Sequence, residues 1–79
     1  MSKPVRIIET VDILNPDGHV VSCEIEFVRI HYTDKWLATC AQYVVSETGR
    51  SHAAARRAAE TAIANRMVSI WALREGRES

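Results

Sequence analysis

The side chains most suited to chemistry gather in one short stretch, GRSHAAARRAAETA, at residues 49–62. Ser51 is a residue type that caps helices, and the first N–H groups of a helix can bind an anion. Five residues at this helix start are candidates to surround a phosphate: Arg50, Ser51, His52, Arg56 and Arg57. The competing interpretation is an ordinary helix cap with solvated arginines, because every helix has such a start. We expect the ordinary cap and keep the anion site as the alternative.

The cysteines and histidines do not have the spacing of a metal site or of a catalytic centre. The five residues of these types are Cys23, Cys40, His19, His31 and His52. No two of them form a CxxC or HxxxH motif, and the alternation around Cys23 favours a packed, free thiol. Cys40 or Ser51 with His52 is the only nucleophile set to consider, and no catalytic signature surrounds it. We therefore expect no metal, no cofactor and no enzymatic activity.

Acidic and large apolar side chains are candidates for contact with another macromolecule. Glu24 and Glu26 alternate onto the polar face of a predicted strand, and Asp12 is a candidate neighbour. Such an acidic face is most often only solvated, but it can also imitate a nucleic-acid backbone or dock on a basic groove. Exposed tryptophans are frequent anchors of protein interfaces. The candidate partner-binding residues are Glu24, Glu26, Trp36, Val68 and Trp71.

The chain is short and has no net formal charge. Its 79 residues predict a single domain, 1–79, with a small core and little free energy to support a strained catalytic site. Residues 1–49 carry a formal charge of −3 and residues 50–74 one of +4. The balance removes the long-range attraction on which non-specific nucleic-acid binders depend. No signal peptide or membrane-spanning stretch is recognisable, so we expect a cytoplasmic protein without membrane contact.

Alternating apolar residues predict three strands. Residues 5–14 have the period of a half-buried strand, and NPDG at 15–18 is a strong turn signal that makes a hairpin with residues 19–32. The apolar phase changes after Phe27, which predicts a bulge or a strong bend near Val28. The sequence TDK marks the next turn. Residues 36–45 are then expected to form the third strand, which SETG would end.

A long helix is predicted from Ser51 to the C-terminal region. Its apolar stripe begins with alanines, which allows close packing on a sheet, and consists of Ala55, Ala59, Ala62, Ile63, Met67, Ile70 and Leu73. Arg66 falls within this stripe and is expected to pair with a sheet carboxylate or to mark the end of the helix. Residues 67–73 either continue the helix or form a fourth strand, and the absence of Gly and Pro favours continuation. A continued helix would leave Val68 and Trp71 as a patch for a partner or for a homodimer.

The strand-to-helix junction resembles the C-terminal half of the double-stranded-RNA-binding domain. That family opens its last helix with a glycine, a serine, a KKxxK basic motif and paired alanines, and the residues that match are Gly49, Ser51, Ala55, Ala58, Ala59, Ala62 and Ile63. The loop NPDGH is also similar to the hairpin loop with which the family reads the minor groove. The three lysine positions hold His52, Ala53 and Arg56 here. Pro4 leads directly into a strand, where the family has a helix.

These observations predict an α+β fold: a three-stranded antiparallel sheet with one long C-terminal helix packed on one face. The small size, the excess of Arg over Lys and the lack of catalytic motifs resemble in kind the accessory proteins of phages and mobile elements, such as anti-CRISPR inhibitors. We therefore expect a regulatory interaction module that binds a macromolecular partner, with a protein favoured. The alternative is a reduced double-stranded-RNA- or DNA-binding domain that contacts phosphates through the start of its helix.

Overall fold

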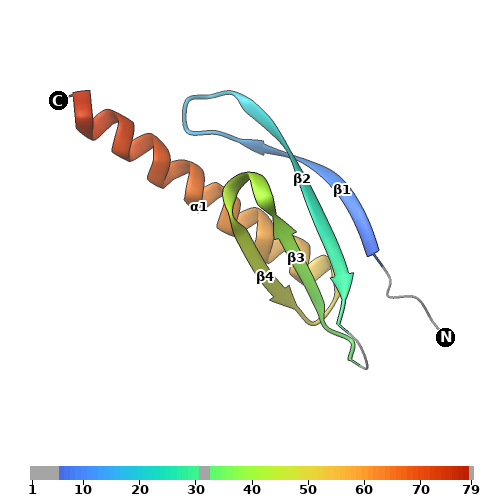
Figure 1. The fold of residues 1–79 in the computed structure, drawn as a ribbon. Helices are drawn as coiled ribbons and strands as arrows, with labels where there is room; N and C mark the ends of the chain where they lie inside the picture. The colour runs from blue at the N-terminus through green and yellow to red at the C-terminus, as the bar shows by residue number, and fades with distance from the viewer. Residues whose placement is uncertain (1–5, 31–32, 79) are drawn as a thin grey trace.

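The described part of the chain consists of a single antiparallel sheet, one long helix and a short 3-10 helix (Figure 1). The computed structural model describes residues 6–30 and 33–78. The elements in chain order are β1 (Arg6–Leu14), β2 (Val20–Arg29), β3 (Trp36–Cys40), the short 3-10 helix η1 (Ala41–Tyr43), β4 (Val45–Gly49) and α1 (His52–Glu78). The strands lie in the order β1-β2-β3-β4, and α1 covers one face of the sheet. The predicted α+β class, with a meandering sheet and a C-terminal helix, is confirmed.

The hairpin of β1 and β2 forms where the turn signal predicts it. Gly18 has a φ of 91°, a left-handed conformation that favours glycine, and its N–H donates to the Asn15 carbonyl at 2.9 Å. The register then runs without interruption from the pair Leu14–Val20 to the pair Arg6–Val28. Of the two alternatives expected near Val28, a bulge or a strong bend, the bulge is therefore wrong. Val28 is half-buried on the outer face of the sheet, opposite Leu37 of β3, and this contact explains the change of apolar phase.

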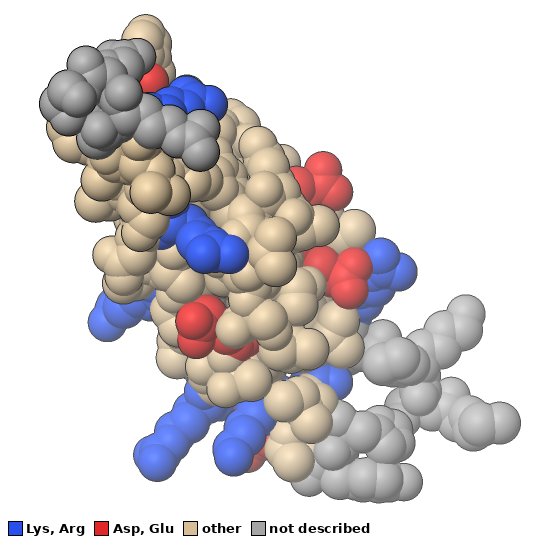
Figure 2. Space-filling view, turned by 60° about the vertical axis from the view of Figure 1, so that its left-hand side comes forward, with Lys and Arg blue, Asp and Glu red and all other residues tan. Residues whose placement is uncertain are grey.

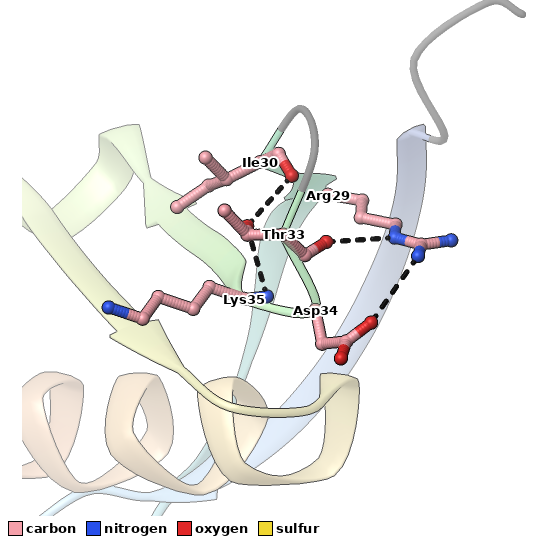
Figure 3. A network of polar contacts seen from close by, with 5 residues as sticks. All are labelled: Arg29, Ile30, Thr33, Asp34 and Lys35. Atoms are coloured by element: carbon pink, nitrogen blue, oxygen red, sulfur yellow. Dashed lines mark hydrogen bonds and ion pairs between the residues drawn. The ribbon is translucent and has the colours of Figure 1, made fainter.

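The turn between β2 and β3 is held by side chains of the predicted TDK sequence (Figure 3). The Thr33 hydroxyl donates to the Ile30 carbonyl at 2.9 Å and accepts from the Lys35 N–H at 3.2 Å. Arg29 donates through Nε to the Thr33 carbonyl at 3.2 Å and lies 3.5 Å from an Asp34 carboxylate oxygen. Residues 31 and 32, which the predicted second strand included, lie outside the described part of the chain, as does Val5 at the start of the first predicted strand.

The third predicted strand, 36–45, is in fact interrupted. β3 ends at Cys40, η1 follows, and Val44 adopts a φ of 54° that turns the chain back. This left-handed conformation is unusual for a β-branched residue, and no local sequence rule points to it. SETG consequently belongs to β4 and does not end β3. The fourth strand is therefore Val45–Gly49, whereas residues 67–73 continue the helix, as favoured from the sequence.

The core lies between α1 and the face of the sheet that α1 covers. Its sheet residues include Cys23, Ile25 and Phe27 of the central strand β2, all fully buried. Both cysteines are buried and unbonded to each other. The helix contributes the fully or almost fully buried residues Ala55, Ala59, Ile63 and Met67. The first part of the predicted stripe is thus confirmed as the core face, but Ile70 and Leu73, at its end, are exposed.

Candidate interaction surfaces

The start of α1 is capped as the sequence predicts. The Ser51 hydroxyl accepts a hydrogen bond from the Ala54 N–H at 3.1 Å, and the Ser51 carbonyl accepts one from Ala55 at 2.9 Å. This arrangement satisfies one of the N–H groups that a helix start leaves without a partner inside the helix.

His52 is half-buried at the N-terminal end of the helix. Its ring meets Phe27 edge-on with centroids 4.5 Å apart, and it lies 5.5 Å from the ring of Trp36. Its Nε2 atom is 2.5 Å from Oε1 of Glu9 in β1. Within the described residues, neither atom has a hydrogen-bond partner elsewhere, so this contact is the polar interaction that each atom makes. His52 therefore connects the start of the helix to the edge strand β1.

Arg56 extends the same group of contacts. Its Nε atom donates to Glu60 at 2.9 Å, and one terminal nitrogen lies 3.6 Å from the second carboxylate oxygen of Glu9. Glu9 thus faces two of the residues proposed for phosphate binding. Period-two alternation places Glu9 on the apolar face of its strand, between Ile7 and Val11, and a charge at such a position is the sequence signal that identifies it.

The five candidates for an anion site do not converge on one point. His52 and Arg56 lie towards β1, whereas Arg57 lines a shallow hollow of about 480 Å³ together with Glu47 of β4 and Asn65. Arg50 is exposed in the connection before the helix. A phosphate at the helix start would have to compete with the Glu9 carboxylate for His52 and Arg56.

The acidic residues lie on the outer face of the sheet, which α1 leaves uncovered. Glu26 accepts a hydrogen bond from Arg6 at 2.7 Å, and Asp12 accepts one from Ser22 at the same distance. Glu24 and Glu26 line a shallow depression of about 360 Å³ on this face, with Ile8 at its border. Asp12 is therefore on the expected face, and two of these three carboxylates have partners within the sheet.

Trp36 lies apart from these acids, because it is half-buried and packs towards His52 on the helix side of the sheet. The structure thus places the predicted partner-binding residues in three separate locations. Glu24 and Glu26 are on the outer face, Trp36 is at the N-terminal end of the helix, and Val68 and Trp71 are near the other end of α1.

Arg66 contradicts both sequence-based expectations. Its Nε atom donates to the backbone carbonyl of Tyr43 at 3.2 Å, so its partner is not a carboxylate of the sheet. The helix continues for three further turns to Glu78, so Arg66 does not mark its end. The Arg66 side chain connects the helix to the last residue of η1. It is exposed and lies at the edge of the core.

Exposed apolar side chains gather at one end of the molecule, where the β1–β2 turn, η1 and the C-terminal half of α1 lie on the same side (Figure 1). Of the nine large apolar side chains exposed in the described part of the chain, seven belong to these segments. We call these seven the apolar end: Leu14, Val20, Val44, Val68, Ile70, Trp71 and Leu73. The other two, Ile7 and Ile8, belong to the opposite half of β1.

A groove of about 210 Å³ opens within the apolar end, between the helix and the hairpin turn. Its lining consists of Asn15, Asp17, Tyr43, Met67, Ile70, Trp71 and Arg74. The backbone N–H of His19 lowers the pKa of Asp17, and the charge of Arg74 lowers it further. Sequence reasoning missed Asn15, Asp17 and Tyr43 as neighbours of the helix end, because nothing local indicates that the hairpin turn and η1 reach it.

The charged side chains do not form a field of one sign on the face seen in Figure 2, where acidic and basic groups are interspersed with uncharged surface. Among the described residues, no three His, Cys, Asp or Glu side chains come together as they would around a metal ion. No helix in the described ranges, 6–30 and 33–78, is both long and apolar enough to cross a membrane.

No protein-family model matches the chain, and no curated protein or solved structure is significantly similar to it. The resemblance to the double-stranded-RNA-binding domain therefore continues to rest on the residues of the strand-to-helix junction and of the NPDGH loop.

Proposed function

We propose that this protein is a non-enzymatic interaction module that binds a protein partner through its apolar end. The observation that carries this proposal is the helix segment 67–73, whose sequence MVSIWAL is apolar around nearly the whole helix. Only Met67 in it is buried, whereas Val68, Ile70, Trp71 and Leu73 are exposed by 52, 42, 42 and 70%.

Exposure of these apolar side chains to water costs free energy, which burial against a partner would recover. A helix that is apolar on all sides is normally surrounded by other parts of a protein, and a large exposed apolar patch commonly marks an interface. Burying each of these side chains would contribute about 1 to 3 kcal/mol to association. Trp71 beside a groove is also the kind of anchor that dominates binding energies at interfaces.

A narrower hypothesis is that the module acts as a regulator, like the small phage or mobile-element proteins that inhibit a nucleic-acid-handling machine such as a CRISPR complex. A module without its own chemistry would act by occupying a surface that its target needs. Glu24 and Glu26 on the open sheet face supply acidic groups that could face a basic groove.

The nucleic-acid alternative uses the helix start instead. Two of the side chains at the helix start, His52 and Arg56, already contact the carboxylate of Glu9. Arg50 and Arg57 are exposed and would have to make most of the phosphate contacts.

The two functions are separated by affinity capture from a lysate of the source cells, with and without nuclease. The tagged chain is compared with Leu73→Glu at the apolar end and with Ile8→Glu as the matched control. Ile8 is 52% exposed, lies away from the apolar end and borders the depression with Glu24 and Glu26, so loss of capture with Ile8→Glu would implicate that acidic face instead. We expect the wild-type chain to capture a protein partner in stoichiometric amount, also after nuclease treatment. The Ile8→Glu variant should still capture this partner, and the Leu73→Glu variant should not.

Two results would contradict this proposal. Loss of all captured material after nuclease treatment would favour the nucleic-acid alternative, in which Arg56→Ala with Arg57→Ala should reduce the salt dependence of binding. Capture that is the same for Leu73→Glu and the wild type would show that the apolar end is not the contact surface.

A further inference from the structure

We infer that a second copy of this chain occupies one side of the apolar end, with the two α1 helices packed antiparallel along a stripe formed by Ala64, Val68 and Trp71. This inference rests on the proposed function, because it identifies a partner of the same end of the molecule. It assigns the stripe to the second copy and leaves the opposite side of the helix, with Leu73, for another protein.

The stripe runs beside the intramolecular core, which Ala64 borders, whereas Val68 and Trp71 of the stripe are exposed. Ala64, Val68 and Trp71 are spaced by four and three residues, which is the spacing of the seam between two packed helices. The helix uses another side for its own sheet, with Ile63 and Met67 buried there. At 100° per residue, Leu73 lies about 140° from Val68, so one partner helix cannot cover both.

The register of a helix pair on this side follows from charge. An antiparallel pair centred on Ile70 would bring Arg66 of each copy beside Arg74 of the other, which is unfavourable. A pair centred between Met67 and Val68 instead places Ala64 of one helix opposite Trp71 of the other. The small side chain of Ala64 leaves room for the large indole, so the stripe is complementary to itself, as a two-fold interface must be.

Strand addition, the other simple mode of association, is blocked at both edges of the sheet. Glu9 in the edge strand β1 points towards the helix and contacts His52 and Arg56. In the opposite edge strand β4, Glu47 is half-buried and borders the helix near Arg57. Charged residues that point inward at an edge strand disfavour pairing with a further strand. Joining two copies by extending the sheet is therefore disfavoured, whereas the exposed apolar side chains of the helix remain available for contact.

Charge and area also favour a second copy. The chain has a formal net charge of 0, so two copies do not repel each other as strongly charged proteins do. Val68 and Trp71 are half-exposed, and each exposes on the order of 100 Å² of apolar surface. The residues that flank the stripe would have to supply the rest of the roughly 600 Å² per copy that the smallest specific dimers bury.

Sedimentation equilibrium of the purified full chain tests this inference, at protein concentrations of about 10 to 200 µM. We expect a mass of twice 8.9 kDa for the wild type at the upper concentration. Val68→Glu should be monomeric there, with its dissociation constant raised at least about 100-fold. The matched control Ile8→Glu should remain dimeric, because Ile8 is equally exposed but distant from the stripe. Circular dichroism checks that both variants are folded.

Cross-linking tests the two-fold position independently of folding stability. Val68→Cys should form a covalent dimer with a short bis-maleimide, since the axis passes beside residue 68 in both copies. Ile70→Cys should react much less, and the natural cysteines are buried. A monomeric wild type at the highest concentration, or equal dissociation by Val68→Glu and Ile8→Glu, would overturn the inference.

The two proposals fail in different ways. If the chain is monomeric but Leu73→Glu still loses its captured protein, the dimer is wrong and the proposed function stands. If neither variant changes mass or capture, both are wrong.

Discussion

Glu9 is an acidic residue that contacts basic side chains at the start of the helix. Its carboxylate lies on the helix side of β1 and contacts both His52 and Arg56. Because these contacts are partly shielded from water, they are stronger than those of a fully exposed ion pair. The same residues that a phosphate would need are thus used to hold an edge strand against the helix.

Glu9→Gln should therefore lower the free energy of unfolding by about 1 to 2 kcal/mol, because the charge-assisted contacts are lost while the side-chain shape is kept. Urea denaturation at neutral pH measures this difference. Glu24→Gln, an exposed residue of the outer face, is the control and should change the free energy by less than about 0.5 kcal/mol. An equal effect of the two substitutions would show that Glu9 does not stabilise the fold.

The buried thiol of Cys23 is expected to make the stability of the fold depend on pH. Burial raises the pKa of its thiol above the ordinary value of 9.0, so the folded protein keeps this proton at pH values where the unfolded chain loses it. The contribution to stability is therefore complete below pH 9.0 and is lost as the pH rises through the pKa of the folded state. We expect urea midpoints to fall on the alkaline side, with a smaller fall in Cys23→Ala. The same slope in both proteins would contradict this assignment.

At the scale of elements, the junction between β4 and α1 depends on a close approach of two backbones. A Cβ atom on Gly49 would lie 2.7 Å from the carbonyl carbon of Ala54 and still closer to the Ala55 nitrogen. Gly18, in the hairpin turn, has open space around it and is required only for its φ of 91°. The two glycines are thus needed for different reasons.

Gly49→Ala should cost about 3 kcal/mol or more, because backbone atoms of the helix cannot move aside without displacing its first turn. Gly18→Ala is the matched comparison and should cost about 1 kcal/mol, the strain of a left-handed alanine. Thermal unfolding followed by circular dichroism measures both. A smaller loss for Gly49→Ala than for Gly18→Ala would mean that the junction can relax.

At the scale of the whole molecule, the helix is longer than the part of the sheet that covers it. The short strands β3 and β4 lie over its N-terminal half, and its C-terminal half extends past them (Figure 1). One continuous apolar stripe consequently has two environments. Ile63 is fully buried, whereas Ile70, two turns further along the same side, is 42% exposed.

Ile63→Ala should lower the free energy of unfolding by about 3 kcal/mol, since it leaves a cavity in the core. Ile70→Ala, the same change on the same side of the helix, should cost less than about 1 kcal/mol. Urea denaturation at low protein concentration compares them without interference from association. Equal losses would show that another part of the chain covers Ile70 in solution.

The sequence by itself determined the local elements. NPDG and the alternation around it predicted the first hairpin, and Ser51 with the alanine stripe predicted the start and the core face of the helix. These features depend on neighbours within a few residues, where turn chemistry and periodicity act directly. The exposed positions of Val68 and Trp71 could also be predicted from the sequence, because an apolar segment without Gly or Pro predicts that the helix continues.

Only the tertiary structure decided which distant residues meet. The contact of Glu9 with His52 joins residues 43 positions apart in the chain, and it depends on how the helix crosses the sheet. The left-handed Val44 divided one predicted strand into two, since local propensity gives no reason for it. The length of β3 and β4 then fixed how far the sheet extends along the helix. The apolar spacing within the helix does not encode how far the sheet reaches along it. That reach decides which part of the apolar stripe is buried and which part is exposed.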